Sequence, residues 1–141
     1  MSATTPVPTR IDIQLDIQWD SSNEPHFAYI PKPPLAHADG TLDLSTVAPN
    51  VELAISLIST GGETFASPTI GIVPYHGKRP DPCPVANDVG HGVFHAMRLS
   101  ADRRTFMMID NNQGKAQFFY ALWFDKPGMA SFAWDPKIIN Q

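Results

Sequence analysis

Residues 10–19 read RIDIQLDIQW, a strict alternation of apolar and polar side chains. Successive side chains of a β-strand point to opposite faces, so this stretch predicts a strand with one buried face and one wet face. Residues 51–57, VELAISL, repeat the pattern, and Gly61-Gly62 ends it. A second half-buried strand is therefore expected there.

Six shorter segments complete the strand pattern. Pro31 and Pro74 stop the first two of them, which favours edge positions in a sheet. Short polar turns join the later segments and predict a meander of antiparallel neighbours. The six predicted strands are residues 26–30, 69–73, 93–99, 104–110, 116–124 and 130–134. About eight short strands and no amphipathic helix predict an all-β fold, an antiparallel two-layer β-sandwich of immunoglobulin-like or cupredoxin-like type.

The segment 116–124 is apolar on both faces. Phe119, Ala121 and Trp123 lie on the face opposite to the one predicted to face the core. Something has to cover this second face: a long loop of the same chain, a ligand or a second subunit. The predicted core residues are Ile13, Leu15, Ile17, Leu53, Ile55, Leu57, Phe118, Tyr120 and Leu122.

The chain of 141 residues has the length of one domain. We expect residues 1–9 to form a flexible N-terminal tail and residues 10–141 to form a single β-sandwich domain. Ten Lys and Arg face 14 Asp and Glu, so neither nucleic acid nor a membrane surface is an expected partner. Cys83 is the single cysteine and no basic, apolar export signal starts the chain. We therefore expect a soluble, cytoplasmic protein.

Two connections are long and rich in proline, residues 31–50 and 74–92. Long loops without secondary structure are uncommon and often bind ligands or cap a site. Proline restricts the unfolded chain, which favours order in such loops.

Histidines are the best candidates for chemistry. His91 and His95 are four residues apart, so a regular strand would place both on one face together with Met97. His76 and Cys83 precede them and could add imidazole and sulfur ligands. Ordinary loop and strand histidines explain the same residues, so we predict neither a metal site nor a cofactor.

No catalytic signature is found in the sequence. A Gly-x-Ser-x-Gly elbow is absent, and Gly61-Gly62 lacks the lysine and helix of a phosphate loop. Cys83 lies between two prolines, where a helix N-terminus that would lower a thiol pKa cannot easily form. We accordingly predict no catalytic residue.

Four short motifs follow one another in the last third of the chain. They read LSAD at 99–102, IDNN at 109–112, FYAL at 119–122 and DPKIIN at 135–140. In this stretch the chain resembles small bacterial β-sandwich proteins of the DP-EP family, which end in Asp-Pro-x-Ile-x-Asn. The resemblance implies the sandwich fold and a bacterial source. Because the family is functionally uncharacterised, it implies no site residue.

The sequence as a whole favours a non-enzymatic binding or assembly module. Its long loops and the apolar outer face of 116–124 would bind a small molecule or a protein partner. The candidate binding residues are Phe119, Trp123, Tyr75, His76, His91 and His95. The alternative is a small enzyme or metal-binding protein with a site formed by His76, His91 and His95.

A homodimer anchored by Trp123 is also expected. The edges of a sandwich invite pairing, and this sequence offers few edge lysines that would prevent it. Acidic residues concentrate before residue 64 and basic residues after it, which favours self-complementary contact. If the 74–92 loop folds over Trp123 instead, the chain remains a monomer.

Overall fold

The computed structural model describes residues 9–30, 40–47, 50–74, 93–112, 117–134 and 136–139. Among these residues there are ten strands and no helix. The strands are β1 (Thr9–Trp19), β2 (Pro25–Ile30), β3 (Leu42–Asp43), β4 (Val51–Leu57), β5 (Thr64–Pro74), β6 (Phe94–Leu99), β7 (Thr105–Asp110), β8 (Gln117–Asp125), β9 (Phe132–Trp134) and β10 (Lys137–Ile139).

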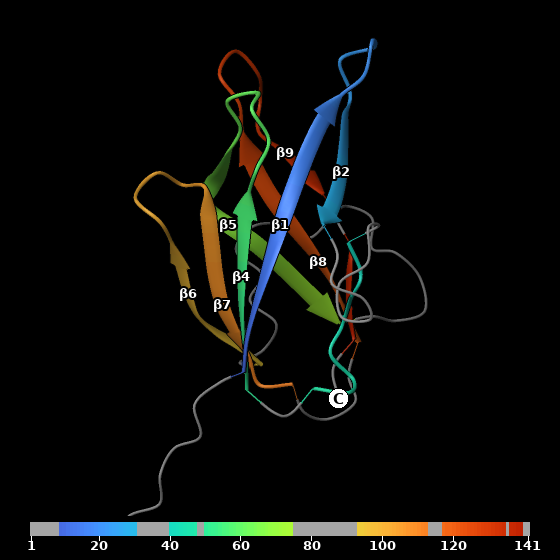
Figure 1. Ribbon diagram of the computed structural model, residues 1–141, viewed down its shortest axis with the longest axis vertical. Coiled ribbons are helices and arrows are strands. Elements are labelled where there is room, and N and C mark those ends of the chain that lie inside the picture. The colour runs from blue at the N-terminus through green and yellow to red at the C-terminus, as the bar shows by residue number, and fades with distance from the viewer. Residues whose placement is uncertain are drawn as a thin grey trace, which may run out of the picture.

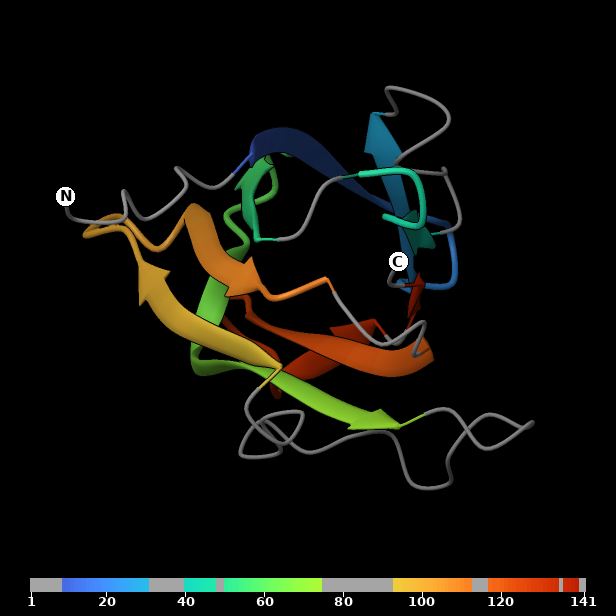
Figure 2. The same cartoon turned by 90° about the horizontal axis from the view of Figure 1, so that it is seen from below.

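The strands form two sheets that pack face to face (Figures 1 and 2). Sheet A has the order β2-β1-β4-β7-β6, and sheet B has the order β3-β10-β8-β5 with β9 paired to β8. The all-β sandwich predicted from the alternation is confirmed. Most pairs are antiparallel, but β1 with β4 and β3 with β10 are parallel. A parallel pair needs a crossover, and β2 and β3 lie in the connection between β1 and β4.

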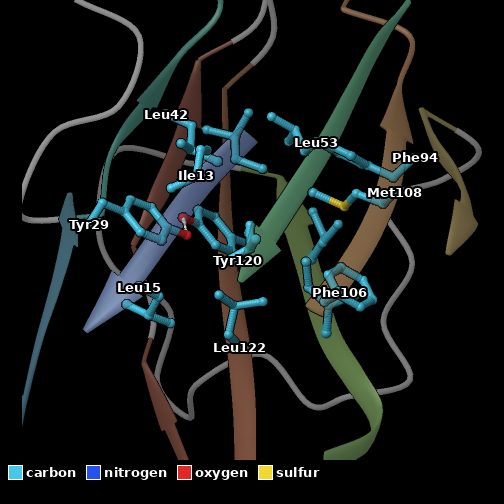
Figure 3. Close-up of a cluster of buried hydrophobic side chains, with 14 of the residues drawn as sticks. Ile13, Leu15, Tyr29, Leu42, Leu53, Phe94, Phe106, Met108, Tyr120 and Leu122 are labelled. Carbon is cyan, nitrogen blue, oxygen red and sulfur yellow. Dashed lines mark hydrogen bonds between the residues drawn. The ribbon is translucent and has the colours of Figure 1, made fainter. Parts of the chain in front are cut away.

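The core lies between the inner faces of the two sheets. Burial alternates along β1 as the sequence predicts, and all nine predicted core residues are buried. Aromatic rings fill much of the space: Phe65 stacks on Phe124 with centroids 5.3 Å apart, and Phe94 meets Phe118 edge-on at 5.1 Å. Figure 3 shows part of this cluster, with side chains from both sheets interdigitated.

Two buried tyrosines join the sheets through a chain of hydrogen bonds (Figure 3). The Tyr120 hydroxyl donates to the Gly40 carbonyl oxygen at 2.7 Å, so the Tyr29 hydroxyl donates the 2.5 Å bond between the two tyrosines. Burial raises the pKa of Tyr29 well above its ordinary value. Gly40 has a φ of 93°, and a Cβ there would collide with Pro136 and the Trp134 ring. Only glycine therefore brings this carbonyl to Tyr120 without strain.

The predicted segments 26–30 and 69–73 are part of edge strands, as expected: β2 ends sheet A and β5 ends sheet B. The predicted hairpin pairs β6–β7 and β8–β9 are also confirmed. β3 and β10 were not predicted, because they have only two and three residues and show no alternation.

The predicted continuation of the meander from 104–110 to 116–124 is wrong, because β7 lies in sheet A and β8 in sheet B. Asn112, with a φ of 53°, turns the chain away from β7, and its N–H donates to Asp110 Oδ1 at 2.8 Å. Its side-chain amide also donates to the carbonyl oxygens of Leu44 and Val47. A short polar connection thus crosses between the sheets here instead of forming a hairpin.

Candidate functional site: the loop end of the sandwich

Three connections lie at one end of the sandwich: residues 20–24 between β1 and β2, residues 58–63 between β4 and β5, and residues 126–131 between β8 and β9 (Figure 1). We call this region the loop end. Two contacts of Trp19, the last residue of β1, help to hold it together.

Trp19 contacts the 126–131 connection and the strand β9 that follows it. Its ring meets Phe132 edge-on with centroids 5.2 Å apart, and Lys126 Nζ lies 4.0 Å above its centre. A cation at this distance from an indole face is attracted by the ring quadrupole. A Cβ at Gly62 would lie 3.8 Å from Pro127 Cδ, so the 58–63 and 126–131 connections are also neighbours.

Arg104 binds the backbone of the 58–63 connection. Its guanidinium donates to the carbonyl oxygens of Leu57 at 3.0 Å, Ser59 at 2.6 Å and Glu63 at 2.9 Å. Two backbone bonds reinforce it, since the N–H of Leu57 donates to the Arg104 carbonyl and the N–H of Phe65 donates to the Arg103 carbonyl. Five hydrogen bonds therefore fix the connection at both ends.

Glu63 is a buried acid at the loop end. Its side chain is fully buried, with Oε1 3.5 Å from Trp19 Nε1, and a Cβ at Gly61 would collide with its carboxylate. Among the described residues, neither Glu63 Oε2 nor the buried Ser59 Oγ has a hydrogen-bond partner. Buried polar atoms are nearly always paired, so the loop end keeps polar groups that its own fold does not use.

Other acids at this end serve their own turns. Asp20 accepts hydrogen bonds from His26 Nε2 at 2.8 Å and from the N–H groups of Glu24 and Ser22. These bonds, that from His26 above all, hold the pKa of Asp20 below its usual value. Such a carboxylate stabilises a turn and is a poor general acid at neutral pH.

An aspartate also stabilises the turn between β6 and β7. Asp102 accepts bonds from Ser100 Oγ at 2.6 Å and from the Arg104 N–H at 3.0 Å, and the Ser100 bond is the main cause of its lowered pKa. Ser100 Oγ in turn accepts from the N–H of Thr105 at 3.0 Å. The turn that presents Arg104 is thus fixed by its own side chains.

Two apolar side chains lie exposed on the connections of the loop end. The N–H of Met129 donates to the Lys126 carbonyl, with Pro127 and a positive-φ Gly128 between them, which is a type II turn. Met129 is 38% exposed at this turn, and Ile58 is 42% exposed at the end of β4. They are two of the three large hydrophobic residues that are exposed in the described part of the chain.

Phe119 and Trp123 share the outer face of β8, as predicted, opposite Val73 of β5 and Ala133 of β9 respectively. Phe119 is only 7% exposed and Ala121 is fully buried, so the middle of this face is not a bare surface. Trp123 is half-buried and lies two residues before the end of β8. The sequence-predicted aromatic residue nearest to the loop end is therefore Trp123.

His95 lies elsewhere, exposed on β6 and opposite Ile109 on the outer face of sheet A. The structure does not bring it to Phe119 and Trp123, which lie on the outer face of sheet B. The expectation that Met97 shares the face of His95 is wrong, because a bulge between His95 and Arg98 shifts the register and Met97 packs against the core.

The remaining candidates, Tyr75, His76 and His91, lie outside the described residues. Residues 1–8 of the expected tail do so too, and Thr9 is the first residue of β1. In the part of the chain that the structure describes, no three His, Cys, Asp or Glu residues are grouped so that they could hold a metal ion.

Sequence reasoning missed the residues that build the loop end. In the sequence, Arg104 is only one of several basic residues near a turn, and Glu63 is one of 14 acidic residues. Their partners lie about forty residues away in sequence, and no local pattern signals such contacts. The turn-forming Ser100 and Asp102 of the LSAD motif were the one usable sign that Arg104, two residues after Asp102, is held in place.

No protein-family model matches the chain, and no curated protein matches its sequence. Within the described ranges the structure has no helix that could span a membrane.

Proposed function

We propose that this protein is a non-enzymatic binding module that recognises a protein partner through the loop end. The observation that carries this proposal is the exposure of Ile58 and Met129 on connections whose backbone is fixed by Arg104 and by the type II turn. A fixed surface loses little conformational entropy on binding, so its apolar contacts count fully toward affinity. Trp123, half-buried two residues before the end of β8, would extend the apolar surface.

A protein partner fits this surface better than a small molecule does. Small-molecule sites are concave and bury most of their ligand, whereas Ile58 and Met129 lie on projecting connections (Figure 1). Apolar side chains at the centre of a polar rim are the usual anchors of protein interfaces. The carboxylates of Asp20 and Asp102 serve turns, which supports binding over acid–base catalysis as the role of this end.

We also propose the type of sandwich, the family and the cellular location that the sequence suggests. The sandwich would be of immunoglobulin-like type, related to the bacterial DP-EP family and cytoplasmic. Loops gathered at one end of such a sandwich are its usual binding surface.

Site-directed photocrosslinking tests the proposal. Photoreactive p-benzoylphenylalanine replaces Met129 at the loop end or, as the control, Gln14 on the wet face of β1. In extracts of the cells that make the protein we expect one discrete product from position 129 and none from position 14, suppressed by excess wild-type protein. The partner identified from this product, once purified, should bind the wild type and not Met129→Asp. Equal products from both positions, or none from position 129, would contradict the proposal.

Metal analysis separates this proposal from the His-based alternative. Protein purified without chelators should contain no stoichiometric metal. Metal that is present in the wild type and lost in both His91→Ala and His95→Ala would replace the binding module with a metal protein.

A further inference from the structure

The edges of the two sheets differ in how well they could pair with another strand. β3 has two residues, and β5 is interrupted by a register shift between Phe65 and Ile70. β6 carries the bulge at Ala96, whose φ is 52°. Short strands and bulges are two of the devices that block edge-to-edge pairing. In the described part of the chain, β2 has neither, because it pairs with β1 over six residues without a shift.

The hydrogen-bond pattern identifies the groups on the free side of β2. The odd-numbered residues Thr9 and Leu15 of β1 bond to the β4 side of the sheet, and the N–H of Asp20 donates to the Glu24 carbonyl at 3.0 Å, so the even-numbered residues form the hydrogen-bonded pairs of the β1–β2 ladder. Such pairs alternate along a ladder, so even-numbered residues of β2 bond to β1 and odd-numbered residues point their backbone groups away. Pro25 fits this pattern because it occupies an outward position, where the missing N–H costs no ladder bond.

Phe27 and Tyr29 therefore direct two N–H groups and two carbonyl groups off the edge of sheet A. None of the described residues forms a hydrogen bond with these four groups. The strand that carries them is held in place, since Phe27 stacks on Trp134 with centroids 5.2 Å apart and Tyr29 bonds to Tyr120.

We propose that a second copy of this chain pairs with β2 along this edge, antiparallel and two-fold symmetric about Ala28. In this register Phe27 meets Tyr29 of the second copy, and Tyr29 meets Phe27 of the second copy. Each pair exchanges two hydrogen bonds, so all four outward groups of each chain are used. Shifting the two-fold axis to Phe27 would place Tyr29 opposite Pro25, which has no N–H to donate. The proposal is independent of the loop end.

The outward side chains of β2 suit the same register. Ala28 meets its own copy, and its small side chain allows close approach at the axis. Ile30 is 47% exposed and would lie opposite His26 of the second copy, where it loses contact with water. An interface of this kind is isologous, because each surface is complementary to itself. An extended segment of another protein could use the backbone groups but would not reproduce this two-fold match of side chains.

Sedimentation equilibrium from about 10 µM to about 1 mM measures the association. The wild type should pass from the mass of one chain toward twice that mass. Ala28→Lys should raise the dissociation constant at least about tenfold, because two ammonium groups would meet at the axis. Within one chain this lysine lies next to Asp16 on β1, so folding is expected to persist. Ile30→Lys is a second variant at an exposed position.

Two controls fix the location of the interface. Gln14→Lys adds the same charge to the same face one strand further in and should leave the dissociation constant unchanged. Trp123→Ser should also leave it unchanged. A mass of one chain at every concentration would overturn the proposal. So would a dimer that Trp123→Ser dissociates while Ala28→Lys and Ile30→Lys do not.

Amide exchange measured by NMR at low and high concentration tests the pairing itself. The amides of Phe27 and Tyr29 should exchange fast in the monomer and at least about tenfold more slowly in the dimer. The amide of Ala28, already bonded to β1, should be protected at both concentrations. Concentration-independent exchange at Phe27 and Tyr29 in a sample that dimerises would contradict pairing through β2.

Discussion

The centre of the sandwich and its loop end treat buried polar groups differently. At the centre, the Tyr29 hydroxyl, the Tyr120 hydroxyl and the Gly40 carbonyl form a continuous hydrogen-bonded chain between the sheets. At the loop end, Arg104 donates three hydrogen bonds to backbone carbonyls, but Glu63 Oε2 and Ser59 Oγ find no partner among the described residues. Groups paired in this way stabilise the fold, whereas the loop end combines incompletely paired groups with exposed apolar side chains. This contrast supports our proposal that the centre is a scaffold and that the loop end recognises the partner.

The largest effect on stability is expected from Arg104→Ala. The substitution removes three hydrogen bonds from a charged donor to backbone carbonyls and should lower the free energy of unfolding by about 3 kcal/mol. Urea denaturation measures the change. Arg103→Ala, in the same turn but with an exposed side chain, is the matched control and should stay within about 0.5 kcal/mol of wild type. Equal losses in both variants would show that Arg104 does not clamp the loop end.

The two tyrosines of the hydrogen-bonded chain at the centre should contribute unequally to stability. Tyr120→Phe removes the acceptor for Tyr29 and the donor to Gly40, so it should cost about 2 kcal/mol, whereas Tyr29→Phe removes one donor and should cost about 1 kcal/mol. Chemical denaturation of both variants gives the comparison. A larger loss for Tyr29→Phe would contradict this order.

Glu63→Gln should raise the free energy of unfolding, whereas the substitutions of Arg104 and the two tyrosines should lower it. The amide keeps the size of the side chain and an oxygen toward Trp19, but it removes the cost of burying a carboxylate that is incompletely hydrogen-bonded. A gain of about 0.5–1 kcal/mol in the free energy of unfolding is expected. Glu24→Gln, at an exposed position in the β1–β2 turn, should change little. A clear loss of stability in Glu63→Gln would show that the charged carboxylate is needed for the fold.

The pH dependence of stability should differ between the turns and the centre of the sandwich. These effects should be the smallest. The lowered pKa values of Asp20 and Asp102 give stability that is present above their ordinary value of 3.8 and is lost as the pH falls below it. The raised pKa of Tyr29 gives stability that is present below pH 10.0 and is lost as the pH rises above it.

Thermal unfolding between pH 2 and pH 11 measures both limbs. Asp20→Asn should flatten the acid limb alone, and Tyr29→Phe should flatten the alkaline limb alone. Unchanged limbs in the two variants would contradict these assignments.

Local periodicity was enough to predict most of the strands and the whole predicted core, because each signal lies within ten residues of sequence. It failed where geometry depends on distant contacts. The chain crosses between sheets after β7 because Asn112 bonds to Leu44 and Val47, and Met97 turns inward because of a bulge at Ala96. Neither feature leaves a local pattern.

The candidate site was predicted less well than the fold. The two apolar faces of β8 pointed correctly to Trp123 as an outer-face residue, but the loop end depends on pairs such as Arg104 with Glu63, which are 41 residues apart. The tyrosine pair is separated by 91 residues. Such contacts arise from the topology of the two sheets, and a single sequence carries no signal for them.

The most direct test of the division between scaffold and recognition is the yield of photocrosslinking from position 58 in two variant backgrounds. Tyr120→Phe, measured under conditions in which it remains folded, should keep the wild-type yield although it is less stable. Met129→Asp should keep wild-type stability and lose the crosslinked product. Equal yields in the two backgrounds, or a loss in Tyr120→Phe alone, would contradict the assignment of recognition to the loop end.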